Sequence, residues 1–381
     1  MIPYSCQSIL EEDVEAVVDV LRSPFLTQGP TGPAFEKSLA EYCGARHATT
    51  VASATAALHL ACLAMDLGKG DYLWTSPNTF VASANCGLYC GAKVDFVDID
   101  PRTYNLSVPA LEEKLAQAAK VGKLPKIVVP VHFGGQSCAM KEIHALSLQY
   151  GFKVIEDASH ALGADYLDQK IGNGRYSDAT VFSFHAVKMI TTGEGGAVVT
   201  NDASLARKVE RLRTHGITRD LLEMSNKTAE PWYYEQVELG YHYRMTDLQA
   251  ALGVSQLQRL DQFVAHRRDL ASAYFDALND SGLGLPWQEP STSSSWHLFP
   301  ILCKDAAARS DLFHKLREQG LGVNVHYIPV YRQPYYQRLS FSPGLCPAAE
   351  SYYARTLSLP IHQRIDRTVI KEISCKVLSL I

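Results

Sequence analysis

The sequence lacks an apolar run long enough to cross a membrane, and it shows no excess of basic residues. Lysine and arginine number 36 against 40 acidic residues, and the formal net charge of −4 leaves no basic footprint for nucleic acid. The stretch MIPYSCQSILEEDVEAVVDVL (residues 1–21) is acidic and polar, which argues against a secretory signal. We therefore expect a cytoplasmic protein whose partners are neither nucleic acids nor membranes.

Signals for disulfides and metal sites are also missing. The nine cysteines are scattered along the chain, and only Cys86 and Cys90 lie close together. An odd number without paired spacing indicates reduced thiols, most of them packed in the core. The 13 histidines show no HExxH motif and no other metal-ligand spacing, so we expect no metal.

The chain does contain a regular alternation of strand-like and helical segments. Its 381 residues suffice for one large domain and a smaller one. Apolar runs of strand length lie at 72–75, 94–98, 126–133, 153–159 and 178–184, with helical patterns between most of them. Such unbroken apolar strands predict an α/β fold with a mostly parallel sheet that is covered on both faces.

The pattern changes in the last third of the chain. From about residue 246 to 278 the periodicity is that of one long helix, which commonly bridges two domains. A Gly/Pro/Ser-rich segment follows, and then a second, shorter α/β pattern begins at WHLFPILC. We predict a large domain over residues 1–250 and a small C-terminal α/β domain over 251–381, bridged by the long helix.

The stretch VFSFHAVKMITTGEGG (residues 181–196) carries the first candidate for chemistry. Ser183 ends a predicted strand, and Lys188 follows five residues later in apolar surroundings. An amine in such a place loses proton affinity and becomes a nucleophile towards an aldehyde. For an isolated lysine, the commoner arrangement is an aliphatic stem on the surface with its charge in water.

Two further stretches fit around the same kind of ligand. ASATAALHL (residues 52–60) places small residues before a helix, where free backbone amides and the helix dipole favour a phosphate, although a plain Ser/Thr cap has the same appearance. In VIEDASHALGA (residues 154–164), Asp157 ends an apolar strand and suits a protonated pyridine nitrogen, although a metal ligand or helix cap is equally plausible. His160 lies one turn further. Together with Lys188, these residues predict a pyridoxal 5′-phosphate enzyme.

The sequence resembles the DegT/StrS family of nucleotide-sugar aminotransferases along essentially its whole length. The matching stretches are LTQGP (26–30), SATAAL (53–58), EDASHALGA (156–164), FSFHAVKMITTGEGGAVVTND (182–202), GYHYRMTDLQAALG (240–253) and VHYIPV (325–330). The resemblance implies a fold-type I transferase with a mostly parallel seven-stranded sheet. It also implies a homodimer whose active sites lie at the subunit interface.

The resemblance also implies roles for individual residues around the cofactor. Lys188 is expected to bind the cofactor aldehyde covalently, and Asp157 to pair with the pyridine nitrogen. Further cofactor contacts are expected from Ala54, Thr55 and Ser183 at the phosphate, Phe80 on the ring and His160 near the phenolic oxygen. At position 242 the family usually has Asn, which reaches the cofactor phosphate of the other subunit. We expect His242 to keep that contact as a hydrogen-bond donor; the less favoured alternative is that it turns away and leaves water in its place.

The activity implied is transfer of the amino group of glutamate to C4 of a UDP-linked 4-keto-6-deoxy-hexose. The residues that match the family's nucleotide and sugar contacts are Tyr4, Thr27, Gln28, Gly29, His185, Arg213, His326 and Tyr327. For Arg213 a structural ion pair is as plausible, and for His185 a packing role is nearly so. The alternatives are another keto sugar (a 3-keto sugar or a pentose), the sugar 3-dehydratase variant, which has histidine in place of the lysine, and a cofactor-binding sensor without turnover.

Overall fold

The computed structural model describes residues 1–226 and 230–381, and its centre is a seven-stranded sheet. The strand order is β2 (His47–Val51), β10 (Gly196–Thr200), β9 (Ala179–Ser183), β6 (Lys153–Asp157), β5 (Ile127–Val129), β3 (Tyr72–Thr75) and β4 (Lys93–Phe96). Strand β10 runs antiparallel to both of its neighbours, and the other pairings are parallel. The predicted mostly parallel seven-stranded sheet is therefore confirmed.

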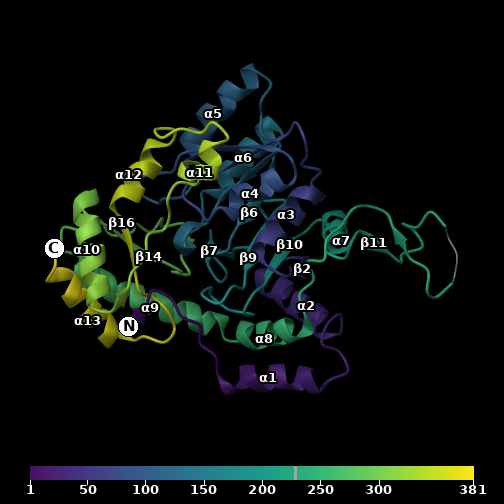
Figure 1. Cartoon of the computed structure of the whole chain (residues 1–381), viewed down its shortest axis with the longest axis horizontal. Coiled ribbons are helices and arrows are strands. Elements are labelled where there is room, and N and C mark those ends of the chain that lie inside the picture. Colours follow the sequence, from purple (N-terminus) through teal and green to yellow (C-terminus); the bar gives the residue numbers. More distant parts are fainter. Residues whose placement is uncertain (227–229) are drawn as a thin grey trace.

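Helices cover both faces of this sheet (Figure 1). One face packs on α3 (Ala54–Ala64), α4 (Ala82–Tyr89) and α7 (Ala203–Leu212). The other face packs on α2 (Thr31–Cys43), α5 (Val108–Lys120), α6 (Met140–Tyr150) and α8 (Asp247–Leu257). Successive strand residues point to opposite faces, so that Ile127 and Val129 enter the first core and Val128 the second. Both faces are apolar, which explains why the strands read as unbroken hydrophobic runs.

The single long helix expected from about residue 246 is instead two helices, α8 and α9 (Leu260–Leu278). The chain leaves helical geometry at Arg259, whose φ and ψ are −108° and 4°. The Arg259 guanidinium donates to Asp13 Oδ2 at 2.6 Å, and the Gln256 amide donates to the same oxygen at 2.6 Å. Because Asp13 lies on α1 (Glu11–Arg22), which packs against α8, these tertiary contacts fix the break.

A third core lies around α9 in the C-terminal part of the chain. It contains α10 (Ala306–Glu318), α13 (Arg367–Leu378) and the antiparallel pair β14 (Phe299–Leu302) and β16 (Thr356–Leu359). The N-terminal strand β1 (Ile2–Pro3) joins this part by pairing in parallel with β15 (Leu321–Gly322). Conversely, α11 (Pro334–Gln337) and α12 (Pro347–Arg355) send Tyr336 and Tyr352 into the first core. The division at residues 250/251 stays a prediction.

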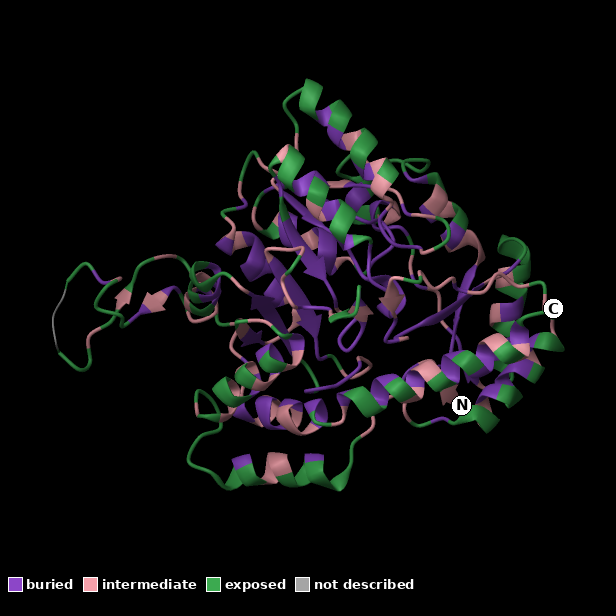
Figure 2. Cartoon of the chain, turned by 180° about the vertical axis from the view of Figure 1, so that it is seen from behind, coloured by how far each residue is buried: buried purple, intermediate pink, exposed green. Residues whose placement is uncertain are grey.

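Short elements complete the described chain. A small sheet has the order β13 (Thr292–Ser293), β7 (Asp165–Tyr166), β8 (Gln169–Lys170), and 3-10 turns lie at Phe133–Gly135 and Val330–Arg332. Strands β11 (Ile217–Thr218) and β12 (Glu235–Gln236) form a hairpin that projects from the body (Figure 1). We call residues 217–226 and 230–240 the hairpin arm. Much of this arm is coloured as exposed in Figure 2. Its exposed residues include the large apolar Leu222, Trp232 and Leu239.

All nine cysteines are free thiols. No helix within residues 1–226 and 230–381 has both the length and the apolar character of a membrane span. Over the same residues, the His, Cys, Asp and Glu side chains form no cluster of three or more that is suited to a metal ion.

Candidate active site

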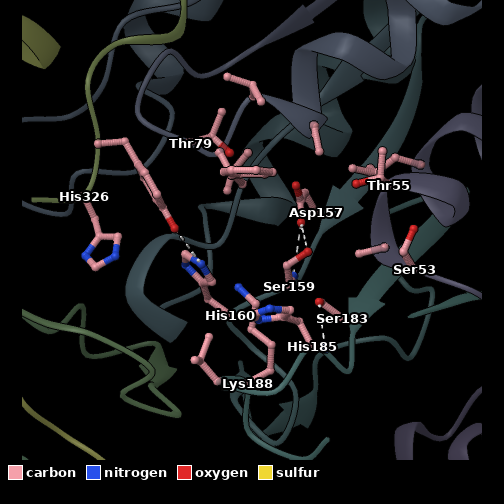
Figure 3. A pocket seen from close by; sticks show the side chains of 18 of the residues that line it. Ser53, Thr55, Thr79, Asp157, Ser159, His160, Ser183, His185, Lys188 and His326 are labelled. Carbon is pink, nitrogen blue, oxygen red and sulfur yellow. Dashed lines mark hydrogen bonds between the residues drawn. The ribbon is translucent and has the colours of Figure 1, made fainter. Parts of the chain in front are cut away.

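A cavity of about 690 Å³ opens beyond the C-terminal ends of β6 and β9. Asp157 is the last residue of β6, and Ser183 is the last residue of β9. Figure 3 shows Asp157, His160, Ser183 and Lys188 facing one space. The residues from the sequence predictions that line it are Tyr4, Ala54, Thr55, Phe80, Asp157, His160, Ser183, His185, Lys188, His326 and Tyr327. The edge of a parallel sheet has thus brought together residues from distant parts of the chain.

Lys188 lies in the loop between β9 and β10, and its side chain enters the cavity. Its backbone nitrogen donates to the carbonyl of His185 at 2.9 Å, and the Ser5 hydroxyl donates to the carbonyl of Val187 at 3.0 Å. Burial lowers the pKa of the Lys188 amine to about 8, against the opposing effect of the Asp157 charge. A far larger fraction of this amine than of an ordinary lysine is therefore unprotonated, and nucleophilic, near neutral pH.

The Asp157 carboxylate is buried and held by two serines. Its Oδ2 accepts from the Ser83 hydroxyl at 2.6 Å, and its Oδ1 accepts from the hydroxyl and backbone nitrogen of Ser159 at 2.6 and 3.1 Å. These three donors leave one acceptor site of the carboxylate free, and it lies on Oδ2. A fixed anion on the cavity wall is suited to a cationic ligand atom.

The N-terminus of α3 forms another part of the wall, with Ser53, Ala54 and Thr55 lining the cavity. Ser53 caps the helix by accepting from the backbone nitrogen of Ala56. The amides of Ala54 and Thr55 belong to the first turn, which has no intrahelical partners. A Cβ on Gly196, at the start of β10, would lie 2.5 Å from the Ala54 nitrogen, so only glycine permits this approach of strand to helix. The N-terminus of α3 therefore has the arrangement of an anion-binding site.

Two histidines of the cavity are held neutral. Burial lowers the pKa of His160 well below its usual value, and the charges of Lys188 and His326 act in the same direction. Burial, followed by the Lys188 charge, lowers the pKa of His326 to about 3. His326 Nδ1 lies 2.8 Å from the Ser358 hydroxyl, and the Asn324 amide donates to Nε2 at 3.3 Å. Both ring nitrogens of His326 are therefore engaged within the chain.

Comparison with known proteins identifies the family of this chain. The DegT/DnrJ/EryC1/StrS aminotransferase family matches residues 7–378. The chain belongs to the DegT/DnrJ/EryC1/StrS aminotransferase family. It is therefore an aminotransferase, as predicted, and its cofactor is pyridoxal 5′-phosphate.

Individual members of this family match the chain over nearly its full length. The Bacillus subtilis spore coat polysaccharide biosynthesis protein SpsC is 41% identical, over 95% of this chain and 92% of its own length. The UDP-4-amino-4,6-dideoxy-N-acetyl-β-L-altrosamine transaminase of Campylobacter jejuni (strain 81-176) is 38% identical, over 96% and 94%. The structure of Helicobacter pylori PseC, an aminotransferase involved in the biosynthesis of pseudoaminic acid, superposes with a TM-score of 0.90. It is 32% identical and covers 100% of this chain and 98% of its own.

The cavity fits the cofactor of this aminotransferase family. It offers an amine of lowered pKa for the aldehyde, a buried carboxylate for the ring nitrogen and a glycine-permitted helix N-terminus for the phosphate. These are three chemically different groups, and each occupies a separate part of the wall. Of the residues predicted to contact the cofactor, all but His242 line this cavity, and His242 was predicted to reach the cofactor of a second copy.

Five predicted residues lie outside the cavity wall of this aminotransferase: Thr27, Gln28, Gly29, Arg213 and His242. The first three occupy the loop between α1 and α2, where Thr27 and Gln28 are exposed. This loop is fixed by Asp247, whose carboxylate accepts from the backbone nitrogen of Gly29 at 3.0 Å. A Cβ at position 29 would lie 2.5 Å from Asp247 Oδ2, so the glycine is required for this contact.

Arg213 and His242 have partners of their own within the chain. The Arg213 guanidinium donates to Glu36 at 2.5 Å and to the carbonyl of Thr50 at 2.7 Å, which is the geometry of a structural ion pair. His242 is exposed and accepts from the Arg244 guanidinium at 3.0 Å. Its ring stacks on His215 at a centroid distance of 5.3 Å.

The sequence predictions missed several polar residues that shape the site. Ser159 lies two positions after Asp157, the spacing of a turn in which the aspartate side chain binds a nearby backbone nitrogen, so a local signal existed. Ser83 comes from α4, far from Asp157 in sequence, and its contact depends on the packed fold. Asn324 lines the cavity beside His326, and Glu194 faces His185 at 3.9 Å near the opening.

Proposed function

We propose that this aminotransferase moves the amino group of glutamate to C4 of UDP-2-acetamido-2,6-dideoxy-β-L-arabino-hexos-4-ulose, a step of pseudaminic acid biosynthesis. The observation that carries the reaction type is Lys188, an amine with a pKa of about 8 on the same cavity wall as a buried carboxylate. The choice of sugar is supported by the names of the Campylobacter and Helicobacter relatives. The alternative is another nucleotide-linked keto sugar. SpsC, whose name refers to spore coat polysaccharide and not to this sugar, is as similar to the chain as the Campylobacter enzyme is.

In this proposal the cofactor, once bound, supplies an electron sink that makes the Cα–H bond of the donor acidic. Lys188 holds the cofactor covalently until the donor amine displaces it. Its freed amine would be the base that takes the proton from Cα of glutamate and the acid that returns it on the cofactor side. Asp157, fixed by Ser83 and Ser159, keeps the ring nitrogen protonated. The same steps in reverse place nitrogen on sugar C4.

The remaining cofactor contacts are proposed from the shape of the wall. Ala54, Thr55 and Ser183 hold the phosphate at the α3 terminus, since all three line the cavity beside that helix end. Phe80, which is 61% exposed and lies two residues before α4, stacks on the ring and thereby becomes covered. His160 lies near the phenolic oxygen.

The sugar nucleotide is proposed to enter from the side of the cavity formed by the C-terminal part of the chain. Tyr4, His326 and Tyr327 form this side together, with Tyr4 and His326 rings 5.3 Å apart. His185, close to the opening, contacts the sugar. Because both nitrogens of His326 already have partners, its contact with substrate is through the ring face.

We also propose a homodimer in which two copies share their active sites. Thr27, Gln28 and His242 are exposed and lie outside the cavity of their own chain, which is expected of groups that serve a second copy. Arg213, engaged with Glu36, is proposed to support that interface rather than to leave its partner. The apolar side chains of the hairpin arm supply surface to be covered on dimerisation. The enzyme acts in the cytoplasm, where glutamate and nucleotide sugars are available.

The deciding experiment gives the purified enzyme glutamate and a panel of UDP-linked 4-keto-6-deoxy-hexoses, together with a 3-keto sugar and a keto pentose. The amino sugar formed is identified by NMR. We expect turnover of the β-L-arabino 4-keto compound and a 4-amino product. Turnover confined to a different sugar would replace the proposed substrate while leaving the reaction type intact.

Lys188→Ala is the control for the reaction type. It is expected to lower turnover to below about one thousandth of the native rate and to abolish covalent capture of the cofactor. The matched variant Lys153→Ala removes an exposed lysine that pairs with Asp178, away from the cavity, and keeps native activity. A sensor without turnover would show cofactor binding but no release of 2-oxoglutarate from glutamate.

A further inference from the structure

Tyr327 and His160 form a hydrogen-bonded pair in the cavity wall. The Tyr327 hydroxyl lies 3.3 Å from His160 Nε2, and the two rings are nearly parallel, with centroids 6.2 Å apart. The Tyr327 backbone nitrogen donates to Asn78 Oδ1 at 3.2 Å, which fixes the start of the side chain. Both residues line the cavity, so the direction of the hydrogen bond between them determines what the wall offers to a ligand.

The backbone nitrogen of Gly134 sets this direction. It donates to His160 Nδ1 at 3.3 Å, and a backbone N–H can only donate. Nδ1 is therefore an acceptor without a proton, and the proton of the neutral imidazole resides on Nε2. His160 consequently donates to the Tyr327 oxygen.

The orientation of the Gly134 amide is built into the fold. Gly134 and Gly135 have φ values of 64° and 106°, which are left-handed conformations that favour glycine. A Cβ on Gly135 would lie 2.5 Å from the Ser295 hydroxyl and 2.9 Å from the Trp296 nitrogen. The pair of glycines thus allows a close approach that directs the amide at His160.

The surroundings keep both members of the pair in these protonation states. His297, itself 2% exposed, packs behind His160 with ring centroids 4.4 Å apart, and Lys188 and His326 face it from the cavity. Burial and these groups disfavour a second proton on His160 by lowering its pKa. Burial, with Tyr4 and Asp157 nearby, raises the pKa of the Tyr327 hydroxyl, so it keeps its proton.

We propose that Tyr327 is a directed hydrogen-bond donor to an acceptor oxygen of the bound ligand, with His160 and Gly134 as its positioning residues. The Tyr327 oxygen already accepts from His160, and within residues 1–226 and 230–381 no protein acceptor takes its proton. That proton is therefore free for the cavity. The acceptor is the phenolic oxygen of the cofactor or the carbonyl oxygen of the keto sugar, and the inference rests on the cofactor seat proposed above.

Tyr327→Phe removes the donor and keeps the ring, and two measurements separate the two acceptors. If the acceptor is the phenolic oxygen, the donor stabilises the deprotonated cofactor, so its loss raises the pKa of the visible absorbance titration by about one pH unit, without sugar present. If the acceptor is the sugar carbonyl, that titration is unchanged and kcat/KM for the keto sugar falls about tenfold or more, while the glutamate half-reaction keeps its native rate. Tyr335→Phe, an exposed tyrosine outside the cavity, is the matched control.

A second measurement tests the hydrogen bonds that run from Gly134 through His160 to Tyr327. Nitrogen-15 NMR of the histidine side chains in the holoenzyme, with His160 assigned from a His160→Gln sample, is expected to show the proton on Nε2. Whichever quantity Tyr327→Phe changes, the pKa of the absorbance titration or kcat/KM for the keto sugar, His160→Phe is expected to change as well. The double variant is expected to change it no more than one single variant does.

Two results would overturn the proposal: a proton on His160 Nδ1, or a Tyr327→Phe enzyme whose absorbance titration and sugar kinetics both match the native enzyme. Failure of the proposed sugar specificity is a separate result. The absorbance titration is read without sugar, and the kinetics use whichever keto sugar the native enzyme accepts.

Discussion

The cavity floor, formed by Asp157, Ser183 and Lys188, and the hairpin arm differ in how their side chains are held. On the floor, Asp157 takes three hydrogen bonds and is buried at a strand end, so its position is determined by the sheet. On the arm, Leu222 is 87% exposed and Trp232 is 72% exposed. Asp157 on the floor has hydrogen-bond partners within its own chain. The large apolar side chains of the arm are instead exposed.

The residues proposed to act on the cofactor and those proposed to contact the substrate therefore lie in different surroundings. Lys188, Asp157 and Ser183, the residues proposed to act on the cofactor, converge in a single chain because the strand ends of one sheet place them together. Thr27, Gln28 and His242 are exposed and lie outside the cavity, and their proposed contacts are to the substrate or to the cofactor of a second copy. Substitutions in the two regions are therefore expected to have different signatures.

The largest effect is expected on the floor, from Asp157→Asn. The amide cannot stabilise a protonated ring nitrogen, so we expect kcat to fall about 100-fold or more. Asp157 raises the pKa of Lys188, so its neutralisation lowers that pKa below about 8. Capture of the cofactor by the cofactor-free enzyme requires the neutral amine. The rate of capture therefore rises with pH. The midpoint of this rise is expected near pH 8 in the native enzyme and at a lower pH in the variant.

Trapping the cofactor with borohydride across a pH series measures this shift. Asp168→Asn, an exposed aspartate outside the cavity, serves as the control with native behaviour. A midpoint that stays at the native pH, or moves upward, would show that Asp157 does not set the proton affinity of Lys188.

An intermediate effect is expected where the arm joins the body, at Arg213. Its side chain is 16% exposed and bonds to Glu36 and to the Thr50 carbonyl, so Arg213→Ala is expected to lower the free energy of unfolding by about 2 kcal/mol. Denaturant unfolding of Arg213→Ala, Glu36→Ala and the double variant measures the coupling. Additive losses together with a raised KM for the sugar would assign Arg213 to substrate instead.

The smallest effect is expected from His242→Asn, because this residue is exposed and lies just after the hairpin arm. We expect kcat within about threefold of native, because Asn also donates a hydrogen bond. A histidine ring can carry a positive charge and asparagine cannot, so we expect the pH dependence of cofactor affinity to differ between the variant and the native enzyme. Equilibrium cofactor binding at a series of pH values tests this. An identical profile would leave the contact with the second copy without support.

The sequence predicted that the three residues of the floor lie together, because their signals are local. Asp157 and Ser183 end apolar strands and Lys188 follows the second of these, and parallel neighbouring strands end at a common edge. The helix break at Arg259 was missed because the sequence there stays periodic, and the cause is Asp13 from another helix. The support of Asp157 by Ser83 was missed for the same reason, since it depends on how α4 packs. Contacts between distant segments have no local pattern from which to infer them.

The pairing of β1 with β15 has a consequence for synthesis of the protein. Tyr4 follows directly after β1, and that strand is held in register by Leu321 and Gly322. A ribosome releases the first residues long before these partners emerge, so the wall that carries Tyr4 closes only when translation is nearly complete. The nascent chain can assemble its central sheet earlier, but it exposes an open, incomplete catalytic chamber until the last part of the polypeptide arrives.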